Sequence, residues 1–288
     1  MRYNEGSKLD PSQVSGGGGR RRTGGIAVGG GAGIIVVILA LLLGFNPDIL
    51  LGGGGEQPGQ PPGGEQTLQN CRTVEDIERD RNCRFVAYTN SIQEYWSENL
   101  EGYQMTKMVV FSQSISTACG QAGSEVGPFY CPADQQVYID IEFLDKLFAQ
   151  LGAEGGDAAE AYVIAHEFGH HVQNLVGTMG EVQRQGQQTG PESGAVRLEL
   201  QADCFAGTWF AWAMAQPDGL ISEITHEDVQ RAQNAAISVG DDYIQRQSGG
   251  GVNPEGWTHG SSEQRQRWLM TGLETGDPNA CDTFGGDI

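Results

Sequence analysis

The sequence predicts a helix-rich α+β domain preceded by a single transmembrane helix. Residues 26–45 hold no charged side chain and are rich in Ile, Val and Leu, as is typical of a membrane-spanning segment. The segments 157–177 and 197–212 carry apolar residues at helical spacing. The short segments 108–111 and 136–141 are rich in β-branched and aromatic residues, which favours strands. Because more helices than strands are expected, the predicted fold class is helix-rich α+β.

The N-terminal part of the chain divides into three segments. Residues 1–25 are rich in glycine and contain Arg20, Arg21 and Arg22, which predicts a disordered cytoplasmic tail because basic residues flank membrane helices on the cytoplasmic side. As a helix, residues 26–45 would cross about 30 Å of hydrocarbon. The Gly- and Pro-rich residues 46–67 predict a flexible linker. We therefore expect a single-pass protein of the inner membrane, with residues 68–288 folded in the periplasm or outside the cell.

A cleaved signal peptide is the alternative interpretation of residues 26–45. The region before the apolar core is long for a signal peptide, and no clear Ala-x-Ala site follows the core. An uncleaved anchor is therefore favoured.

The elements of the domain over 68–288 follow from periodicity and turn residues. Three pairs of residues have the spacing of helix caps: Asp157 with Glu160, Thr225 with Asp228, and Ser261 with Gln264. In chain order we expect a helix over 74–100, strands over 108–111 and 136–141, and helices over 141–151, 157–177, 197–212, 225–246 and from 261 onward.

Composition excludes one class of function and indicates a compartment. A net charge of −20 at pH 7 argues against nucleic-acid binding, which needs a basic surface. All six cysteines follow residue 68, and an even number in an exported domain indicates disulfides. Buried free thiols are the alternative, whereas the absence of a C-x-x-C pair argues against a zinc–cysteine site. One of the many possible pairings joins Cys71 to Cys83, Cys119 to Cys131 and Cys204 to Cys281.

The motif His166-Glu167-Phe168-Gly169-His170 carries most of the chemical information. Histidines four residues apart lie on the same face of a helix, so both imidazoles can bind one metal ion. Glu167 is then close enough to exchange a proton with a water on that metal. This is the H-E-x-x-H arrangement of zinc peptidases. An ordinary helix with two solvated or core histidines is the alternative, and the helical context favours the metal site.

A zinc peptidase site needs a third protein ligand. The third-histidine pattern fails because Gln173 and Val176 occupy the required positions, and the reversed H-x-x-E-H order is absent. Glu199 and Asp203 lie four residues apart on the next long helix and share a face. Glu199 is therefore the predicted third ligand, and Asp203 is predicted to accept the free N–H of a ligand histidine. A solvated helix face is the alternative, but carboxylates among apolar neighbours usually have partners.

The combination of His166-Glu-Phe-Gly-His170 with Glu199-Leu-Gln-Ala-Asp203 resembles the gluzincin arrangement of zinc peptidases. Four further stretches and the Gly-rich basic N-terminus make the chain similar to a bacterial family of membrane-anchored proteins, the putative neutral zinc metallopeptidases. The resemblance covers nearly the whole chain and implies a zincin-like metalloprotease domain with a small sheet. It also implies that an edge strand near Tyr138 pairs with extended substrate. The four stretches are Thr117-Ala-Cys-Gly120, Gly127-Pro-Phe-Tyr-Cys-Pro-Ala-Asp134, Val137-Tyr-Ile-Asp140 and Thr258-His-Gly-Ser-Ser-Glu-Gln-Arg265.

The predicted function is zinc-dependent cleavage of exported protein or peptide by a membrane-anchored endopeptidase. His166, His170 and Glu199 would hold Zn²⁺ with one water, whose pKa the metal lowers. Glu167 would act as general base and then donate the proton to the leaving amine. His259 is the preferred group to stabilise the oxyanion, because it lies in the family-like Thr258–Arg265 stretch.

Other assignments stay open at this point. His226 and Tyr243 are further candidates for the oxyanion, and His259 could instead be a loop or cap residue. His171 points about 100° away from His170 around the helix and is not expected to bind the metal. The whole protein could be an inactive metal-binding regulatory module, against which Glu167 argues, or a zinc hydrolase of a non-protein amide or ester. Serine catalysis is not indicated, since the G-x-S-x-G motif is absent.

Overall fold

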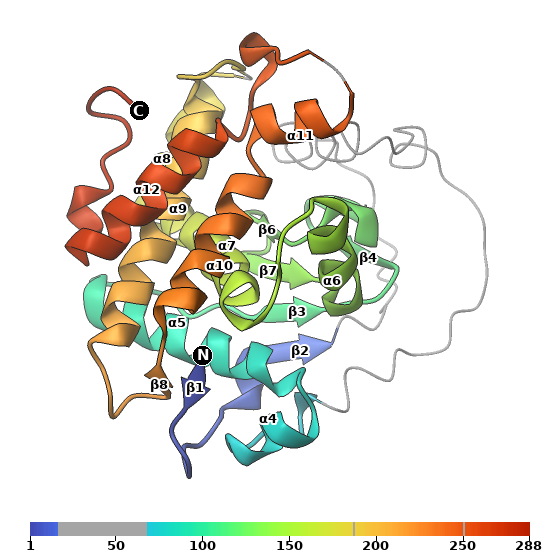
Figure 1. The fold of residues 1–288 in the computed structure, drawn as a ribbon, viewed down its shortest axis with the longest axis vertical. Helices are drawn as coiled ribbons and strands as arrows, with labels where there is room; N and C mark the ends of the chain where they lie inside the picture. Colours follow the sequence, from blue (N-terminus) through green and yellow to red (C-terminus); the bar gives the residue numbers. More distant parts are fainter. Residues whose placement is uncertain (17–67, 187, 250) are drawn as a thin grey trace.

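Helices predominate in the part of the chain that the structure describes (Figure 1). The computed structural model describes residues 1–16, 68–186, 188–249 and 251–288. The α-helices are α4 (Glu75–Arg79), α5 (Cys83–Asn99), α6 (Ile141–Gln150), α7 (Asp157–Val176), α8 (Thr178–Arg184), α9 (Gly194–Met214), α10 (His226–Ser238), α11 (Asp241–Gln247) and α12 (Ser262–Thr275). The strands are β1 (Arg2–Tyr3), β2 (Val14–Gly16), β3 (Met108–Val110), β4 (Ser114–Thr117), β5 (Gly120–Gly123), β6 (Phe129–Cys131), β7 (Gln136–Ile139) and β8 (Ile221–Glu223).

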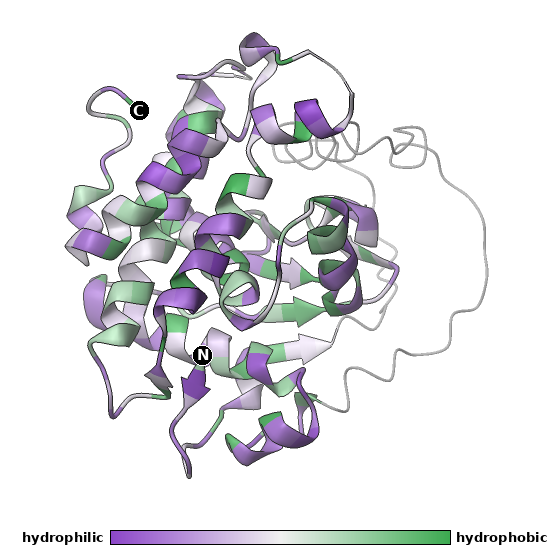
Figure 2. Ribbon diagram, viewed as in Figure 1, coloured by the Kyte–Doolittle hydropathy of each residue, from purple (hydrophilic) through white to green (hydrophobic). Residues whose placement is uncertain are grey.

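The main sheet has the strand order β2-β3-β7-β6. Strands β2, β3 and β7 are parallel, and β6 runs antiparallel to β7. Strand β3 is hydrophobic in Figure 2, and Met108 of β3 and Val137 and Ile139 of β7 are fully buried. The expectation that the strand near Tyr138 forms a sheet edge is wrong, because β7 lies between β3 and β6. Among the described residues, β6 is the edge strand on this side.

The first sixteen residues belong to the folded domain and are not a disordered tail. Strand β1 pairs with β8, and β2 extends the main sheet beside β3. Leu9 and Val14 are buried in the core. The prediction failed because the glycines lie mainly after residue 16, whereas the preceding segment carries apolar residues that pack.

The predicted transmembrane helix at 26–45 and the predicted linker at 46–67 lie outside the described residues. Within the described part of the chain, none of the helices has the length and apolar character needed to cross a membrane. Strands within residues 1–16 pair with strands of the domain over 68–288. A single-pass anchor at 26–45 would instead place these two parts of the chain on opposite sides of a membrane. The fold class that includes this anchor is therefore wrong, and the described residues form a mixed helical and stranded domain.

Two long predicted helices are each divided in the structure. The segment 74–100 breaks between α4 and α5. The segment 225–246 breaks between α10 and α11 at Gly240, where a Cβ atom would overlap the backbone of Ser262. The break matters for function because it places Asp241 at the start of α11, beside the loop that precedes α12.

The cap predictions have mixed outcomes. The capping boxes of Thr225 with Asp228 and of Ser261 with Gln264 are confirmed. That of Asp157 with Glu160 is wrong: α7 begins after Gly156 without a side-chain cap. The buried Glu160 instead accepts hydrogen bonds from the arginine side chains of α5 and its preceding turn, Arg84 and Arg81. Glu160 thus pairs with arginines distant in the sequence and does not form the predicted capping hydrogen bond.

Three disulfides form with the pairing considered from the sequence, Cys71–Cys83, Cys119–Cys131 and Cys204–Cys281. The first two close short local loops. The third joins α9 to the chain that follows α12, here called the C-terminal segment. None of the described cysteines is free.

Helix α9 lies at the centre of the helical layer and contacts α7, α12 and α5 (Figure 1). It approaches α12 closely at two glycines. A Cβ atom on Gly207 would overlap the backbone of Leu269, and one on Gly272 would overlap the carbonyl oxygen of Cys204. This contact brings the first turns of α12, with Arg265, over the middle of α9.

Replacing Gly272 by alanine is expected to lower the free energy of unfolding, because the methyl group would push α12 away from α9. Such overpacking costs about 1–3 kcal/mol. Gly180→Ala is the matched control: no described neighbouring element lies within 4 Å of the position that its methyl group would take, and alanine favours helix, so neutral or improved stability is expected. Thermal unfolding compares the two. Equal melting temperatures would contradict the close helix contact.

Candidate metal centre

The sequence of α7 allows α9 to approach it closely. Gly169, the third residue after His166 in the motif, faces Ala202 of α9, and a Cβ atom at this glycine would come within 3.0 Å of the Ala202 Cα. The short helix–helix distance places Glu199, one turn before Ala202, opposite the two histidines. The glycine between the two histidines thus allows α9 to pack closely enough for Glu199 to join them.

Three buried side chains gather where α7 faces α9. His166, His170 and Glu199 each offer one ligand atom, and these atoms all lie within 4.8 Å of one another. His166 Nε2 lies 3.2 Å from Glu199 Oε2, and His170 Nε2 lies 3.4 Å from Glu199 Oε1. Ligand atoms bound tetrahedrally to one zinc ion lie about 3.3 Å apart. The spacing therefore suits a single ion of this size.

The outer nitrogen of each histidine has a protein partner. His166 Nδ1 lies 2.8 Å from Asp203 Oδ1, as the sequence predicted for this aspartate. His170 Nδ1 lies 2.8 Å from Gln173 Oε1. Because carboxylate and amide oxygens accept, each Nδ1 carries a proton, and each Nε2 is the nitrogen that faces Glu199 and the candidate metal position.

Arg265 is the buried cation of the site. Its Nη2 donates to Asp203 Oδ1 at 2.9 Å and to the Tyr162 hydroxyl at 3.2 Å. Its Nη1 lies 3.4 Å from Glu199 Oε2. The guanidinium is only 3% exposed, so it connects a metal-ligand carboxylate with the carboxylate that orients His166.

The mutual proximity of these groups shifts their pKa values. Burial alone would lower the pKa of His166, but Asp203 and Glu199 outweigh it and raise this pKa to about 10. Burial alone would raise the pKa of Glu199, but the charge of His170 and hydrogen bonds from both histidines hold it well below its usual value. Burial opposes charge on Arg265 as well, yet Asp203, Tyr162 and Glu199 raise its pKa. The group is held together by opposite charges.

Glu167 stands apart from this network. It is 8% exposed, and no described residue hydrogen-bonds to its carboxylate. Burial raises its pKa, and the charges of His170 and His166 offset this only in part. A buried carboxylate without a protein partner is unusual, because burying a charge is costly unless it is paired. Its oxygens remain available to a molecule in the site.

The imidazole of His259 contacts the carboxylate of Asp241 through its Nδ1 atom. Its Nδ1 lies 3.3 Å from Asp241 Oδ1. The other oxygen of Asp241 accepts the backbone N–H groups of Thr258, His259 and Gly260. Burial would lower the pKa of His259, but the hydrogen bond to Asp241 and the charge of Glu199 raise it. The loop lies against α9, since a Cβ atom on Gly260 would contact Leu200.

The remaining histidine and tyrosine candidates have other roles. His171 Nε2 donates to the carbonyl of Gln104, so its Nδ1 accepts from the Tyr130 hydroxyl and links α7 to β6. His226 is exposed at the start of α10. The Tyr243 hydroxyl accepts from a side-chain amide on its own helix. The contacts of His171 and Tyr243 support a structural role, and the exposed His226 is not part of the buried group.

The donor set and the charge of the site fit a divalent metal. Two imidazoles and one carboxylate are the ligands that catalytic zinc takes, with one position left for water or substrate. Three buried carboxylates, of Glu167, Glu199 and Asp203, belong to this site, and the guanidinium of Arg265 contacts the last two. With both histidines neutral, as metal ligands must be, two negative charges would remain, which match a divalent cation.

Four residues of the site were not assigned from the sequence: Tyr162, Gln173, Asp241 and Arg265. The acidic residues among apolar neighbours could have indicated that a basic residue would lie beside them, but not which basic residue. Gln173 lies one turn after His170, so its spacing did carry a signal. Tyr162 likewise precedes His166 by four residues.

The chain resembles known proteins over most of its length. The profile of the family described as putative neutral zinc metallopeptidase matches residues 4–284. An uncharacterized protein of Mycobacterium tuberculosis is 50% identical over 222 residues, 75% of each chain. The uncharacterized protein YpfJ of Escherichia coli K12 is 42% identical over 238 residues, 80% of this chain and 79% of that relative. No solved structure matches significantly. The chain therefore belongs to the putative neutral zinc metallopeptidase family.

Proposed function

We propose that this protein is a zinc-dependent endopeptidase. The observation that carries the proposal is the position of Glu167: a buried carboxylate without a described hydrogen-bond partner, next in sequence to a buried His-His-Glu group. A metal that only stabilised the fold would not need this acid. Membership of the zinc metallopeptidase family supports the same reaction.

His166, His170 and Glu199 would hold the ion. When bound, zinc supplies Lewis acidity, which lowers the pKa of water and polarises a carbonyl. Glu167 takes a proton from the attacking water and delivers it to the leaving amine. Asp203 and Gln173 keep both histidines in the tautomer that presents Nε2.

His259 is proposed to donate a hydrogen bond to the developing oxyanion. Asp241 accepts from Nδ1 and so directs Nε2 away from itself. The raised pKa of His259 favours the protonated ring, in which Nε2 is a donor. Donors placed where negative charge develops commonly contribute a factor of about 10²–10³ in rate.

An extended peptide is the proposed substrate, and β6 is the proposed strand that receives it. This strand is the edge of the main sheet among the described residues. It also contacts α7 beside the histidine motif, since the Tyr130 hydroxyl accepts from Asn174 and contacts His171. A free strand edge can pair with a peptide backbone of any sequence. The strongly negative charge of the chain makes nucleic acid an unsuitable partner.

An oxidising compartment outside the cytoplasm is the proposed location of the domain. Three disulfides use every cysteine of the sequence, and such bonds persist where thiols are not kept reduced. Substrates would then be exported proteins or peptides.

Zinc dependence tests the proposal. The full chain is expected to cleave an unfolded protein such as casein, to stop when a zinc chelator is added, and to recover when zinc is restored. Glu199→Ala is expected to lose bound zinc and cleavage together, because one of three ligands is removed. Glu263→Ala, an exposed glutamate on α12, is the control and should keep both. A Glu199→Ala protein with full zinc content, or a zinc-loaded wild type that cleaves no unfolded protein, would contradict the proposal.

A further inference from the structure

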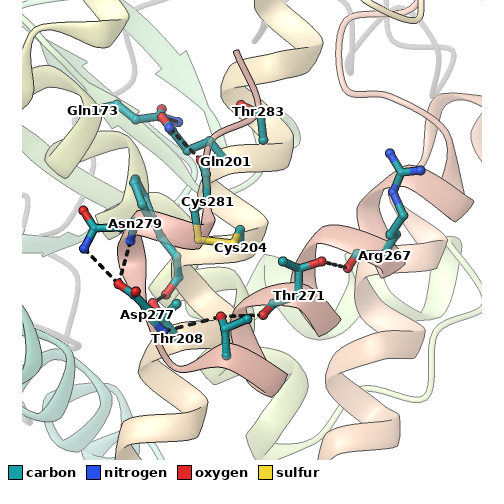
Figure 3. Close-up of a disulfide and its surroundings, with 12 residues drawn as sticks. Gln173, Gln201, Cys204, Thr208, Arg267, Thr271, Asp277, Asn279, Cys281 and Thr283 are labelled. Carbon is teal, nitrogen blue, oxygen red and sulfur yellow. Dashed lines mark hydrogen bonds between the residues drawn. A yellow bond between two sulfur atoms is a disulfide. The ribbon is translucent and has the colours of Figure 1, made fainter. Parts of the chain in front are cut away.

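A chain of side-chain amides leads from His170 to the C-terminal segment, and Figure 3 shows its outer part. Gln173 Oε1 lies 2.8 Å from His170 Nδ1. Gln173 Nε2 donates to the carbonyl of Leu198 at 2.7 Å and to Gln201 Oε1 at 3.2 Å. Gln201 Nε2 donates to the carbonyl of Cys281 at 3.0 Å. Gln173 is fully buried, so water does not compete for its bonds.

Two backbone carbonyls fix the direction of this chain. A carbonyl can only accept, so the NH₂ group of Gln173 must face Leu198 and that of Gln201 must face Cys281. The Oε1 of Gln173 then faces His170, and Nδ1 of that histidine must be the donor. The proton on Nδ1 of His170 thus follows from groups that do not titrate, which leaves Nε2, 3.4 Å from Glu199, as the nitrogen for the metal.

The C-terminal segment is held against one face of α9. Arg197, Gln201 and Cys204 are spaced by four and three residues and share this face. Cys204 is bonded to Cys281, and Thr283 Oγ1 donates to the carbonyl of Arg197 at 2.7 Å. Figure 3 shows Gln201 beside this disulfide, with its partner Gln173 across the gap between α9 and α7. The anchor of the amide chain is therefore fixed on both sides of Gln201.

We propose that Gln173 is a positioning residue for His170, and that the disulfide-held C-terminal segment supports it through Gln201. This inference rests on the proposed zinc site. The two histidines differ in this respect: His166 is oriented by Asp203, a charged partner held by Arg265, whereas His170 depends on neutral amides. Metal affinity is then sensitive to a disulfide that contains no ligand.

Gln173→Leu in the full chain tests the first step. Zinc affinity measured against a competing chelator is expected to fall about 10–100-fold, as for other partners of metal histidines. The absorption spectrum of the cobalt-substituted protein should change, because it reports ligand geometry. Nitrogen NMR of the histidines, recorded without metal, should show loss of the hydrogen bond from the Nδ1–H of His170. Gln183→Leu, on the exposed side of α8, is the control and should change none of these.

The support from the C-terminal segment is tested by removing its anchor. Cys204→Ala with Cys281→Ala is expected to weaken zinc binding about threefold or more. Cys71→Ala with Cys83→Ala should lower the melting temperature without changing zinc affinity, because that disulfide lies away from the amide chain. If the first pair does not fold, Gln201→Leu alone carries the test, since this side chain is partly exposed and its loss removes the same link.

The outcomes separate this inference from the proposed function. A wild type that binds no zinc overturns the proposed function, whereas the hydrogen bond of His170 Nδ1 is read without metal. Wild-type zinc affinity and an unchanged Nδ1 signal of His170 in Gln173→Leu overturn the role of Gln173. Equal zinc affinity in the two disulfide variants, or in Gln201→Leu and the wild type, overturns the role of the C-terminal segment.

Discussion

Exchange of Glu167 for glutamine is expected to abolish peptide hydrolysis while zinc binding persists. The carboxylate is close enough to His170, His166 and Glu199 to feel their charges, but it is not one of the three candidate ligands. An amide has nearly the same shape and cannot accept the proton of the attacking water. No described residue hydrogen-bonds to the Glu167 carboxylate, so the exchange breaks no side-chain hydrogen bond within the described protein. Its effect is therefore confined to proton transfer.

The expected loss is about 10²–10⁴-fold in kcat, the usual contribution of a general base. The melting temperature should stay equal or rise, because a buried unpaired acid is replaced by a neutral group. Cleavage of a quenched fluorescent peptide and bound zinc are measured on the same samples. Glu181→Gln, an exposed glutamate on α8, is the matched control. Cleavage at the wild-type rate by Glu167→Gln would remove the assigned base from the mechanism.

The sequence predicted those parts of the site that depend on spacing within one helix. His166 and His170 share a face because they lie four residues apart, and Glu199 and Asp203 repeat this spacing. A helix has one geometry, so such spacing translates directly into position. The structure indeed places the first three in one group and Asp203 on His166 Nδ1.

Contacts between distant segments could not be predicted in this way. Arg265 reaches Asp203 across 62 residues, and only the close packing of α12 on α9 brings them together. Gln201 meets Cys281 through a disulfide that was one of many possible pairings. The sequence carries the residues that make these contacts but no local signal of which partner they find.

The N-terminal prediction was wrong for a related reason. The apolar run at 26–45 has the composition of a membrane span, and composition says nothing of where the flanking residues pack. Strand β2 is three residues long and finds its place only by pairing with β3, from more than ninety residues later in the sequence. The position of β7 inside the sheet depends on the same pairing, which is why the strand near Tyr138 is not an edge.

Replacing Arg265 by methionine is expected to have the largest effect on stability at the site. Methionine fills a similar volume but leaves Asp203 and Glu199 buried without their guanidinium. Removing one partner of a buried ion pair typically lowers the free energy of unfolding by about 3–5 kcal/mol. Zinc should restore part of this loss, because a divalent cation beside Glu199 neutralises the same carboxylates.

Urea unfolding with and without zinc measures both effects. Arg267→Met, an exposed arginine on the same helix, is the control and should change stability by less than about 0.5 kcal/mol. Arg265→Lys should fall between wild type and Arg265→Met, because lysine keeps the charge but lacks the planar fork that reaches Asp203 and Glu199 through two separate nitrogens. If Arg265→Met unfolds at the same urea concentration as Arg267→Met, the guanidinium does not neutralise these carboxylates.

Adding Asp203→Asn to Arg265→Met separates the two roles of the ion pair. The double variant is expected to be more stable than Arg265→Met alone, because one of the carboxylates left uncompensated becomes neutral. Its zinc affinity should fall below that of Arg265→Met, since His166 Nδ1 then donates to a neutral amide instead of a carboxylate. Stability is thus expected to rise with the improved charge balance, while zinc affinity falls with the weaker acceptor on His166. A rise of both together would mean that Asp203 acts on zinc only through the fold.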